Sequence, residues 1–144
     1  MGPDTLTLTR TFHFSAGHQL ANPALGEAEN HALYGACFRP HGHNYLLEVT
    51  VGGRIDPRTG MAADLEALES VVRRAVLDLV DHRDLNADVP ALGGIITSGE
   101  NLVRAFWRLL SSALPAGSLR RVAVVETANN TFEYYGDTDD GDTR

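Results

Sequence analysis

Lysine, paired cysteines and long apolar runs are missing from this chain, and each absence excludes a class of function. All 12 basic residues are arginine, so chemistry that needs a lysine amine as nucleophile or Schiff-base partner is excluded. The single cysteine, Cys37, excludes a disulfide within the chain and is typical of a reducing compartment. No apolar stretch approaches the roughly 18 residues of a membrane span, and the first residues lack the apolar core of a signal peptide. We therefore expect a cytoplasmic protein that is not embedded in a membrane.

An excess of positive charge is missing as well. The 19 acidic residues outnumber the 12 basic ones and give a formal net charge of -7. This balance argues against a nucleic acid or an anionic membrane as partner, because both are bound through clusters of basic side chains. With 144 residues, 43% of them hydrophobic, the chain suits one domain with a buried core. We expect this domain to cover residues 1–136 and the polar residues 137–144 to form a flexible tail.

Alternating apolar and polar residues predict four strands, over residues 5–15, 41–51, 122–126 and 131–135. A helix is predicted after the N-cap Asp64, and a second after the capping sequence Thr97-Ser98-Gly99-Glu100, ending before Pro115. The apolar stripe of the first helix comprises Leu65, Leu68, Val72, Ala75, Val76 and Leu79, and that of the second comprises Leu102, Phe106, Leu109, Leu110 and Ala113. This order predicts an α+β fold, a four-stranded antiparallel sheet with two helices on one face. Its edges and other face need a partner subunit or closure into a barrel.

A pair of histidines opens the second predicted strand. His41 and His43 are two residues apart, so both imidazoles point to the same face and can reach one ion. His18, just past the first strand, supplies a third nitrogen if the two strands are neighbours. Three histidines leave one position open for water or substrate, which is the composition of a catalytic zinc site. An ordinary pair of histidines is the alternative, and we interpret His13 and His31 as structural.

A cupin is a competing metal protein, because its motif combines His-x-His with a nearby glutamate, and Glu48 lies at nearly that distance. On a regular strand, however, Glu48 faces away from His43, since the two are an odd number of residues apart. Parity therefore argues against a cupin-type oxygenase unless a bulge intervenes.

Further residues carry acid–base or binding chemistry. Cys37 lies four residues before His41, where a nearby zinc and Arg39 would favour a thiolate that acts as a base. Asp81 could orient the imidazole of His82 at the end of the first helix. Glu126 shares its face with valines, so it needs a partner: either a ligand with two N–H donors or an arginine of the chain. A buried inert cysteine and a helix-capping histidine are the structural alternatives for Cys37 and His82.

Four motifs occur in an order that resembles one enzyme family. They are F-S-A-G-H at 14–18, C-F-R-P-H-G-H-N-Y at 37–45, D-H-R-D-L-N at 81–86 and V-E-T-A-N-N at 125–130. The combination is similar to the 6-pyruvoyl-tetrahydropterin and 6-carboxytetrahydropterin synthases, from about Phe12 to Gly136. The resemblance implies the tunnelling fold (T-fold), in which subunits assemble their sheets into a β-barrel, usually as a dimer of trimers with active sites at subunit interfaces.

The resemblance also implies roles for individual residues. His18, His41 and His43 match the zinc ligands, Cys37 the catalytic base, and Asp81 and His82 a second proton-transfer pair. Glu126 matches the anchor of the pterin ring and Thr127 would assist it. The implied substrate is 7,8-dihydroneopterin triphosphate. We expect Arg39 to contact the triphosphate and Thr97 and Ser98 to contact the pterin, whereas Gly99 replaces a hydroxyl residue that relatives commonly carry.

Two products are compatible with this set of residues. Three residues separate Cys37 from His41, as in the 6-carboxytetrahydropterin synthases, which favours the 6-carboxy product with loss of acetaldehyde and triphosphate in a queuosine-type pathway. The stretches at 53–61 and 126–130 resemble instead the 6-pyruvoyl enzymes of tetrahydrobiopterin biosynthesis, which eliminate triphosphate. An alternative of another class is a non-catalytic protein that binds zinc and pterin.

Overall fold

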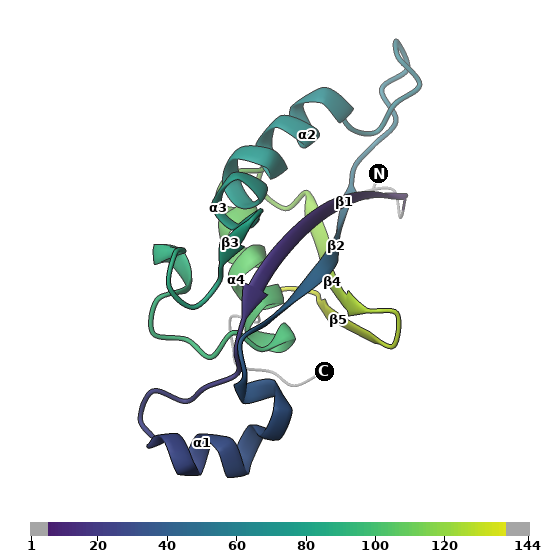
Figure 1. The fold of residues 1–144 in the computed structure, drawn as a ribbon. Coiled ribbons are helices and arrows are strands. Elements are labelled where there is room, and N and C mark those ends of the chain that lie inside the picture. Colours follow the sequence, from purple (N-terminus) through teal and green to yellow (C-terminus); the bar gives the residue numbers. More distant parts are fainter. Residues whose placement is uncertain (1–5, 138–144) are drawn as a thin grey trace.

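The computed structural model describes residues 6–137. Of the expected tail 137–144, only Asp137 lies within this range. Thr5, the first residue of the first predicted strand, lies outside it. Five strands form one sheet in the order β3-β1-β2-β4-β5. They are β1 (Thr7–His18), β2 (His41–Gly52), β3 (Arg83–Asp84), β4 (Leu119–Thr127) and β5 (Asn130–Tyr134). The two long strands β1 and β2 run antiparallel beside each other over their whole length, from Thr7 opposite Gly52 to His18 opposite His41 (Figure 1).

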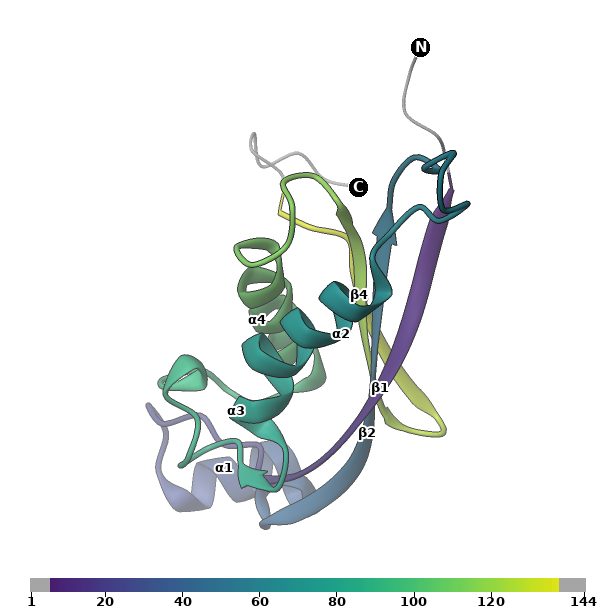
Figure 2. The same ribbon diagram turned by 90° about the horizontal axis from the view of Figure 1, so that it is seen from above.

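Helices lie against one face of this sheet. One continuous helix is made of α2 (Leu65–Val72), a π-helical turn (Arg73–Leu77) and α3 (Asp78–Val80), and α4 covers Gly99–Ser111. Seen from above, α2, α3 and α4 form a layer on a single side of the strands (Figure 2). Asp64 caps α2 by accepting from the Ala67 N–H, and Ser98 caps α4 by accepting from the Asn101 N–H. The predicted α+β fold and both predicted helix starts are therefore confirmed.

One helix, one strand and two 3-10 segments were not predicted. The segment between the first two predicted strands, for which no helix was predicted, forms α1 (Glu27–Tyr34) and a 3-10 turn over Gly35–Phe38, so His31 lies on a helix. Figure 1 shows α1 beyond the ends of β1 and β2. Strand β3 pairs in parallel with Ala16 and Gly17 of β1, so the sheet of the described chain has five strands instead of four. Short 3-10 helix also occurs at Pro90–Leu92.

The π-helical turn changes which side chains of the long helix are buried. A π turn contains more residues than an α turn, so the buried stripe is displaced beyond it. Leu77 and Val80 are buried, whereas Leu79, which the regular spacing placed in the core, is 36% exposed. The prediction for Leu79 was therefore wrong. In the second helix, α4 ends at Ser111, and Ala113 is exposed beyond it rather than part of its apolar stripe.

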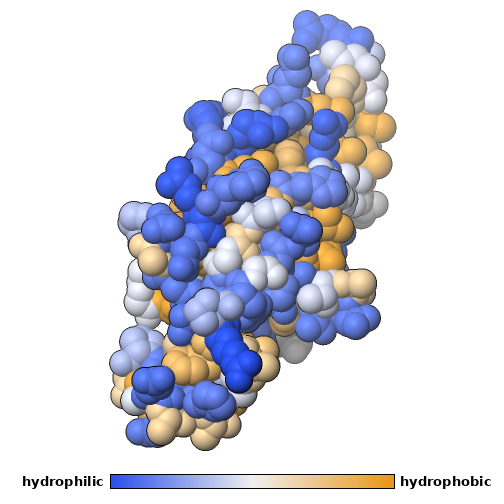
Figure 3. All heavy atoms as spheres, viewed as in Figure 1, coloured by the Kyte–Doolittle hydropathy of each residue, from blue (hydrophilic) through white to orange (hydrophobic). Residues whose placement is uncertain are grey.

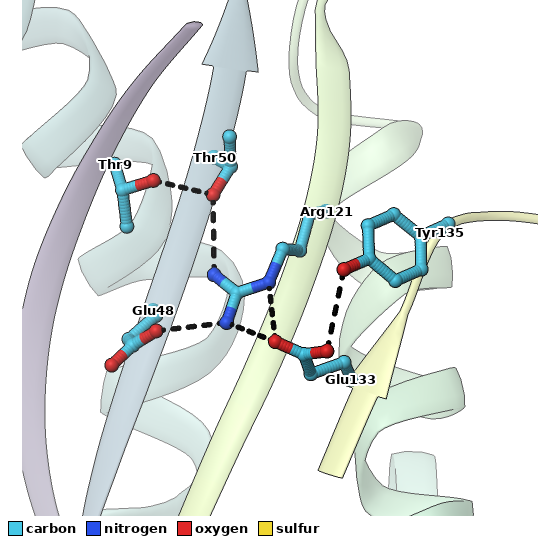
Figure 4. A network of polar contacts seen from close by, with 6 residues as sticks. All are labelled: Thr9, Glu48, Thr50, Arg121, Glu133 and Tyr135. Carbon is cyan, nitrogen blue, oxygen red and sulfur yellow. Dashed lines mark hydrogen bonds and ion pairs between the residues drawn. The ribbon is translucent and has the colours of Figure 1, made fainter. Parts of the chain in front are cut away.

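The core lies between the helices and the near face of the sheet. Alternate residues of β2, among them Tyr45, Leu47 and Val49, are fully buried there together with Phe106 of α4. The far face of the sheet carries polar side chains, including a network around Arg121 (Figure 4). On the side seen in Figure 1, hydrophilic side chains dominate the surface and hydrophobic ones come through in patches (Figure 3). Within the described residues, every helix is too short or too polar to span a bilayer.

Candidate metal centre and active site

The three histidines predicted as metal ligands meet at one end of the β1–β2 pair. Because His18 lies opposite His41 and Ala16 lies opposite His43, the register of the two strands brings the imidazoles together. The ring centroids of His18 and His41 are 4.6 Å apart, those of His18 and His43 5.1 Å, and those of His41 and His43 4.9 Å. One ligand nitrogen of each ring lies within 4.8 Å of the others. His18 could serve as the third ligand only if the first two long strands were neighbours, and this pairing is thus confirmed.

Backbone carbonyls orient two of the rings. The Nδ1 atom of His18 lies 2.9 Å from the Thr97 carbonyl oxygen, and Nδ1 of His41 lies 2.7 Å from that of Arg39. A carbonyl oxygen only accepts, so each Nδ1 carries the proton and leaves Nε2 as a free lone pair. The Nε2 atoms of His18 and His43 are buried without a hydrogen-bond partner in the described chain. Three converging nitrogens, two of them orphaned, fit a metal such as zinc with an open fourth position.

Burial favours the neutral form of two of these candidate ligands. Burial lowers the pKa of His18 below its ordinary value of 6.5, although the hydrogen bond to Thr97 opposes this effect. Burial also lowers the pKa of His43, while the charge of Glu126 opposes it. Both rings are therefore neutral near pH 7, the form in which imidazole binds a metal.

Tyr45 extends the same face beyond His43, and sequence reasoning assigned it no role. Its ring stacks on Phe14 with centroids 4.6 Å apart and lies 5.3 Å from the ring of His43. The side chain is fully buried, and its hydroxyl has no partner among the described residues. Burial, followed by the charge of Glu126, raises the pKa of Tyr45, so the hydroxyl keeps its proton. The two-residue spacing after His41 and His43 is the signal that could have pointed to this donor.

Glu126 occupies a β-bulge next to the histidines. Val125 lies opposite Thr131, but Thr127 lies opposite Asn130, so Glu126 is the extra residue on β4. Its charge reaches His18, His43 and Tyr45. The arginine alternative is not found: in the described chain the ion pairs of Arg121 go to Glu48 and Glu133, and none involves Glu126. The carboxylate is thus left for a ligand, while the Thr127 hydroxyl accepts from the Asn129 N–H in the adjoining turn.

Asp81 and His82 are attached to β1 by backbone hydrogen bonds. The Ser15 N–H donates to Asp81 Oδ1 at 3.0 Å, and the His82 N–H donates to the Ser15 carbonyl at 2.6 Å. Asp81 Oδ1 also lies 3.0 Å from His82 Nδ1, the orienting contact that the sequence predicted. His82 is the only non-glycine residue of the described chain with a positive φ, at 60°, a strained conformation that is common at functional sites.

The His82 side chain is 82% exposed and lines an open cavity of about 500 Å³. His43 and Asn44 line the same cavity, whereas Asp81, His18 and His41 do not. Cys37 and Glu126 are not among its lining residues. Cys37 is exposed in the 3-10 turn, where its carbonyl accepts from the Leu20 N–H just beyond His18. Arg39, also exposed, follows this turn directly.

The first turn of α4 lies beside the site. The Ser98 hydroxyl caps the helix, and the Thr97 hydroxyl is buried against Gln19 and Asn86 instead of being free for a ligand. Gly99 is buried against Phe132 of β5: a Cβ added at Gly99 would lie 2.2 Å from two ring carbons. The aromatic ring therefore occupies the space that a side chain at position 99 would need.

Glu48 decides against the cupin alternative. Its carboxylate accepts a hydrogen bond from Arg121 at 3.0 Å, in the network on the far face of the sheet (Figure 4). Parity therefore predicted its orientation correctly, and Glu48 is not part of the three-histidine group.

The fold and the site define an α+β protein with a candidate three-histidine metal centre, an oriented aspartate–histidine pair and a free glutamate. Comparison with known proteins shows the family within this class. Residues 7–137 match the family model of 6-pyruvoyl tetrahydropterin synthase, and the chain belongs to this family. It is 40% identical over 132 residues to the human 6-pyruvoyl tetrahydrobiopterin synthase, covering 90% of this chain and 91% of that protein.

A solved structure and a more distant relative complete the comparison. The 6-pyruvoyl tetrahydropterin synthase of Caenorhabditis elegans superposes with a TM-score of 0.88 and 35% identity, covering 95% of this chain and 100% of that one. A 6-carboxy-5,6,7,8-tetrahydropterin synthase from Aquifex aeolicus is 28% identical over 156 residues, covering 88% of this chain and 96% of that protein. The family resemblance expected from the sequence motifs is confirmed.

Proposed function

We propose that the protein is a zinc-dependent lyase that converts 7,8-dihydroneopterin triphosphate to 6-pyruvoyl tetrahydropterin. The observation that carries this proposal is the convergence of His18, His41 and His43, with the free carboxylate of Glu126 on the same side of the sheet. Higher identity to the human 6-pyruvoyl enzyme than to the Aquifex 6-carboxy enzyme supports this product over the one that the cysteine spacing favoured.

Substrate binding is divided between two groups. Glu126 accepts from two N–H donors of the pterin ring, which accounts for a carboxylate without an ion pair beside buried tyrosine and histidine. The three histidines hold a zinc ion, which when bound polarises side-chain oxygens of the substrate and acidifies the neighbouring bonds. Arg39 is exposed near His41 and contacts the triphosphate. Ser98, just before α4, contacts the pterin.

Proton transfer falls to Cys37 and to the Asp81–His82 pair. Cys37 accepts a proton from a side-chain carbon of the substrate, and His82 accepts a proton on the opposite face and returns it to the substrate during tautomerisation. Asp81 is fixed by the Ser15 N–H and orients His82 through Nδ1. Triphosphate leaves, and tautomerisation gives the 6-pyruvoyl product.

The 6-carboxy reaction is the second candidate. It is favoured by the short connection of three residues from Cys37 to His41, of which Phe38 ends the 3-10 turn and Arg39 is extended before β2 begins. The two reactions begin with similar proton abstraction but differ in the bond that breaks, because only the 6-carboxy product requires carbon–carbon cleavage with release of acetaldehyde.

Product analysis by mass spectrometry tests this proposal on the zinc-loaded protein incubated with 7,8-dihydroneopterin triphosphate. We expect 6-pyruvoyl tetrahydropterin and triphosphate. Acetaldehyde with 6-carboxytetrahydropterin would establish the second candidate. Cys37→Ala and His82→Gln should each lower kcat by about 100-fold or more while zinc is retained, and His31→Gln, on exposed α1, serves as the matched control. Zinc and pterin binding with no turnover in the unmodified protein would indicate a non-catalytic binder.

A further inference from the structure

Asn86 is a residue of the D-H-R-D-L-N segment to which the proposed reaction gives no role. Its side-chain amide makes a two-point contact with the backbone of Gln19, the residue after His18. The Gln19 N–H donates to Asn86 Oδ1 at 2.9 Å, and Asn86 Nδ2 donates to the Gln19 carbonyl at 3.0 Å. The end of β1 is therefore held by a side chain from a segment more than 60 residues later in the chain.

Thr97 connects Asn86 to the ring of His18. The Thr97 side chain is fully buried, and its hydroxyl lies 3.3 Å from Asn86 Oδ1 and 3.2 Å from the Gln19 carbonyl. The carbonyl of Thr97 in turn accepts from Nδ1 of His18 at 2.9 Å. Thr97 thus fixes the tautomer of His18, and Asn86 and Gln19 contribute to fixing Thr97.

The backbone before His18 is held by the same segment. The Leu85 N–H donates to the Gly17 carbonyl at 2.8 Å, and the Asn86 N–H donates to Asp84 Oδ1 at 2.9 Å, which shapes the turn after β3. Residues 84–86 therefore contact the backbone on both sides of His18. These contacts add to the pairing of His18 with His41 in holding the end of β1.

We propose that Asn86 is a positioning residue of the metal centre, acting through Gln19 and Thr97 to hold His18 in its ligating orientation. The proposal rests on the metal-binding part of the proposed function and is independent of which product forms. Groups that orient a metal-bound histidine commonly change metal affinity by about 10- to 100-fold when they are removed. Asn86 is exposed, so its substitution leaves the hydrophobic core intact.

Zinc affinity of the full chain, measured by competition with a chromogenic chelator at fixed pH, tests the proposal. We expect Asn86→Ala to weaken zinc binding by about 10- to 100-fold. Asn86→Asp keeps the acceptor for the Gln19 N–H and the Thr97 hydroxyl, so we expect this variant to lose less zinc affinity than Asn86→Ala. The ligand-field spectrum of the cobalt-substituted Asn86→Ala protein should also differ from that of the unmodified protein, because the orientation of His18 changes.

Asn30 supplies a matched control. Its buried amide also holds backbone, donating to the carbonyls of Asn22, Leu25 and Gly26, but it makes no contact with the three histidines in the described chain. Asn30→Ala should lower stability and leave zinc affinity unchanged. Equal weakening in Asn30→Ala and Asn86→Ala, or unchanged affinity in Asn86→Ala, would overturn the positioning role alone. Failure of the unmodified chain to bind zinc would overturn the metal assignment itself.

Discussion

Protonation of His18 and His43 is governed by burial more than by neighbouring charge. Burial is the largest cause lowering the pKa of both rings, and the opposing charge of Glu126 does not reverse it. The same neutrality that suits metal binding makes the folded chain vulnerable to acid, because the unfolded chain takes up protons on these rings more readily.

The metal-free protein should therefore lose stability as the pH falls. With a folded-state pKa below 6.5, the folded state binds fewer protons than the unfolded state, so the free energy of unfolding decreases as the pH falls through 6.5. Urea unfolding from about pH 8 to about pH 5.5 measures this dependence. His18→Gln should flatten the profile, whereas His31→Gln, on exposed α1, should follow the unmodified protein. Parallel profiles for all three proteins would contradict this explanation.

Single residues differ in how far the sequence predicts them. The spacing of His41 and His43 predicts their common face, and Glu48 is placed on the other face by parity alone. His18 depends on the pairing of β1 with β2, which the sequence does not specify until a partner strand is known. Thr97 orients the ring of His18 through its backbone carbonyl. Every residue has such a carbonyl, so no sequence signal identifies Thr97. The orientation of Asn86 is likewise set by a long-range backbone contact.

At the scale of elements, Arg121 joins three strands on the far face of the sheet. Its guanidinium donates to Glu48 of β2 at 3.0 Å and to Glu133 of β5 at 2.6 Å, and it reaches the Thr50 hydroxyl, which pairs with Thr9 of β1 (Figure 4). The Arg121 side chain is only 18% exposed. The network therefore fixes β4 between β2 and β5.

Arg121→Leu should lower the free energy of unfolding by about 1–2 kcal/mol, because two carboxylates lose their shared partner. Arg58→Leu, which removes an 86% exposed arginine beside Asp56, should change it by less than about 0.5 kcal/mol. Urea unfolding measures both. The hydrogen bond from Arg121 is the main cause lowering the pKa of Glu133. The contribution of this pair is thus complete above the ordinary value of 4.5 and lost in acid, so the two profiles should converge at low pH.

Elements with a buried apolar stripe were predictable, and those without one were not. The N-caps Asp64 and Ser98 precede regular stripes and mark α2 and α4 correctly. Helix α1 buries only Asn30, and the three carbonyl contacts of that amide hold it in place of a hydrophobic face. The two residues of β3 are too few for any periodicity, and the π turn changes the phase of a stripe that looks regular in the sequence.

At the scale of the whole molecule, the sheet is covered on one side only. Strand β3 pairs with just two residues of β1, so most of the outer edge of β1 has no strand partner in the described chain. Open edges and an uncovered face are features that proteins usually protect by pairing or assembly. The family resemblance implies a dimer of trimers closed into a barrel.

Sedimentation velocity should therefore give a homo-oligomer of about six times the chain mass of 15.6 kDa. The expected mass should persist on dilution, because sheet-to-sheet pairing between subunits would bury extensive backbone and side-chain surface. A single species with the mass of one chain at all concentrations would contradict the assembly, and would require the proposed site to work within one subunit.

The contact between Gly99 and Phe132 also constrains how this sequence can change through descent. Any residue that adds a Cβ at position 99 meets the ring, whereas a smaller residue at position 132 leaves only a gap. A hydroxyl residue at position 99 therefore requires either a displaced ring or a smaller side chain at position 132. Relatives that carry a hydroxyl residue at position 99 should thus differ at position 132 as well, so the two positions should vary together.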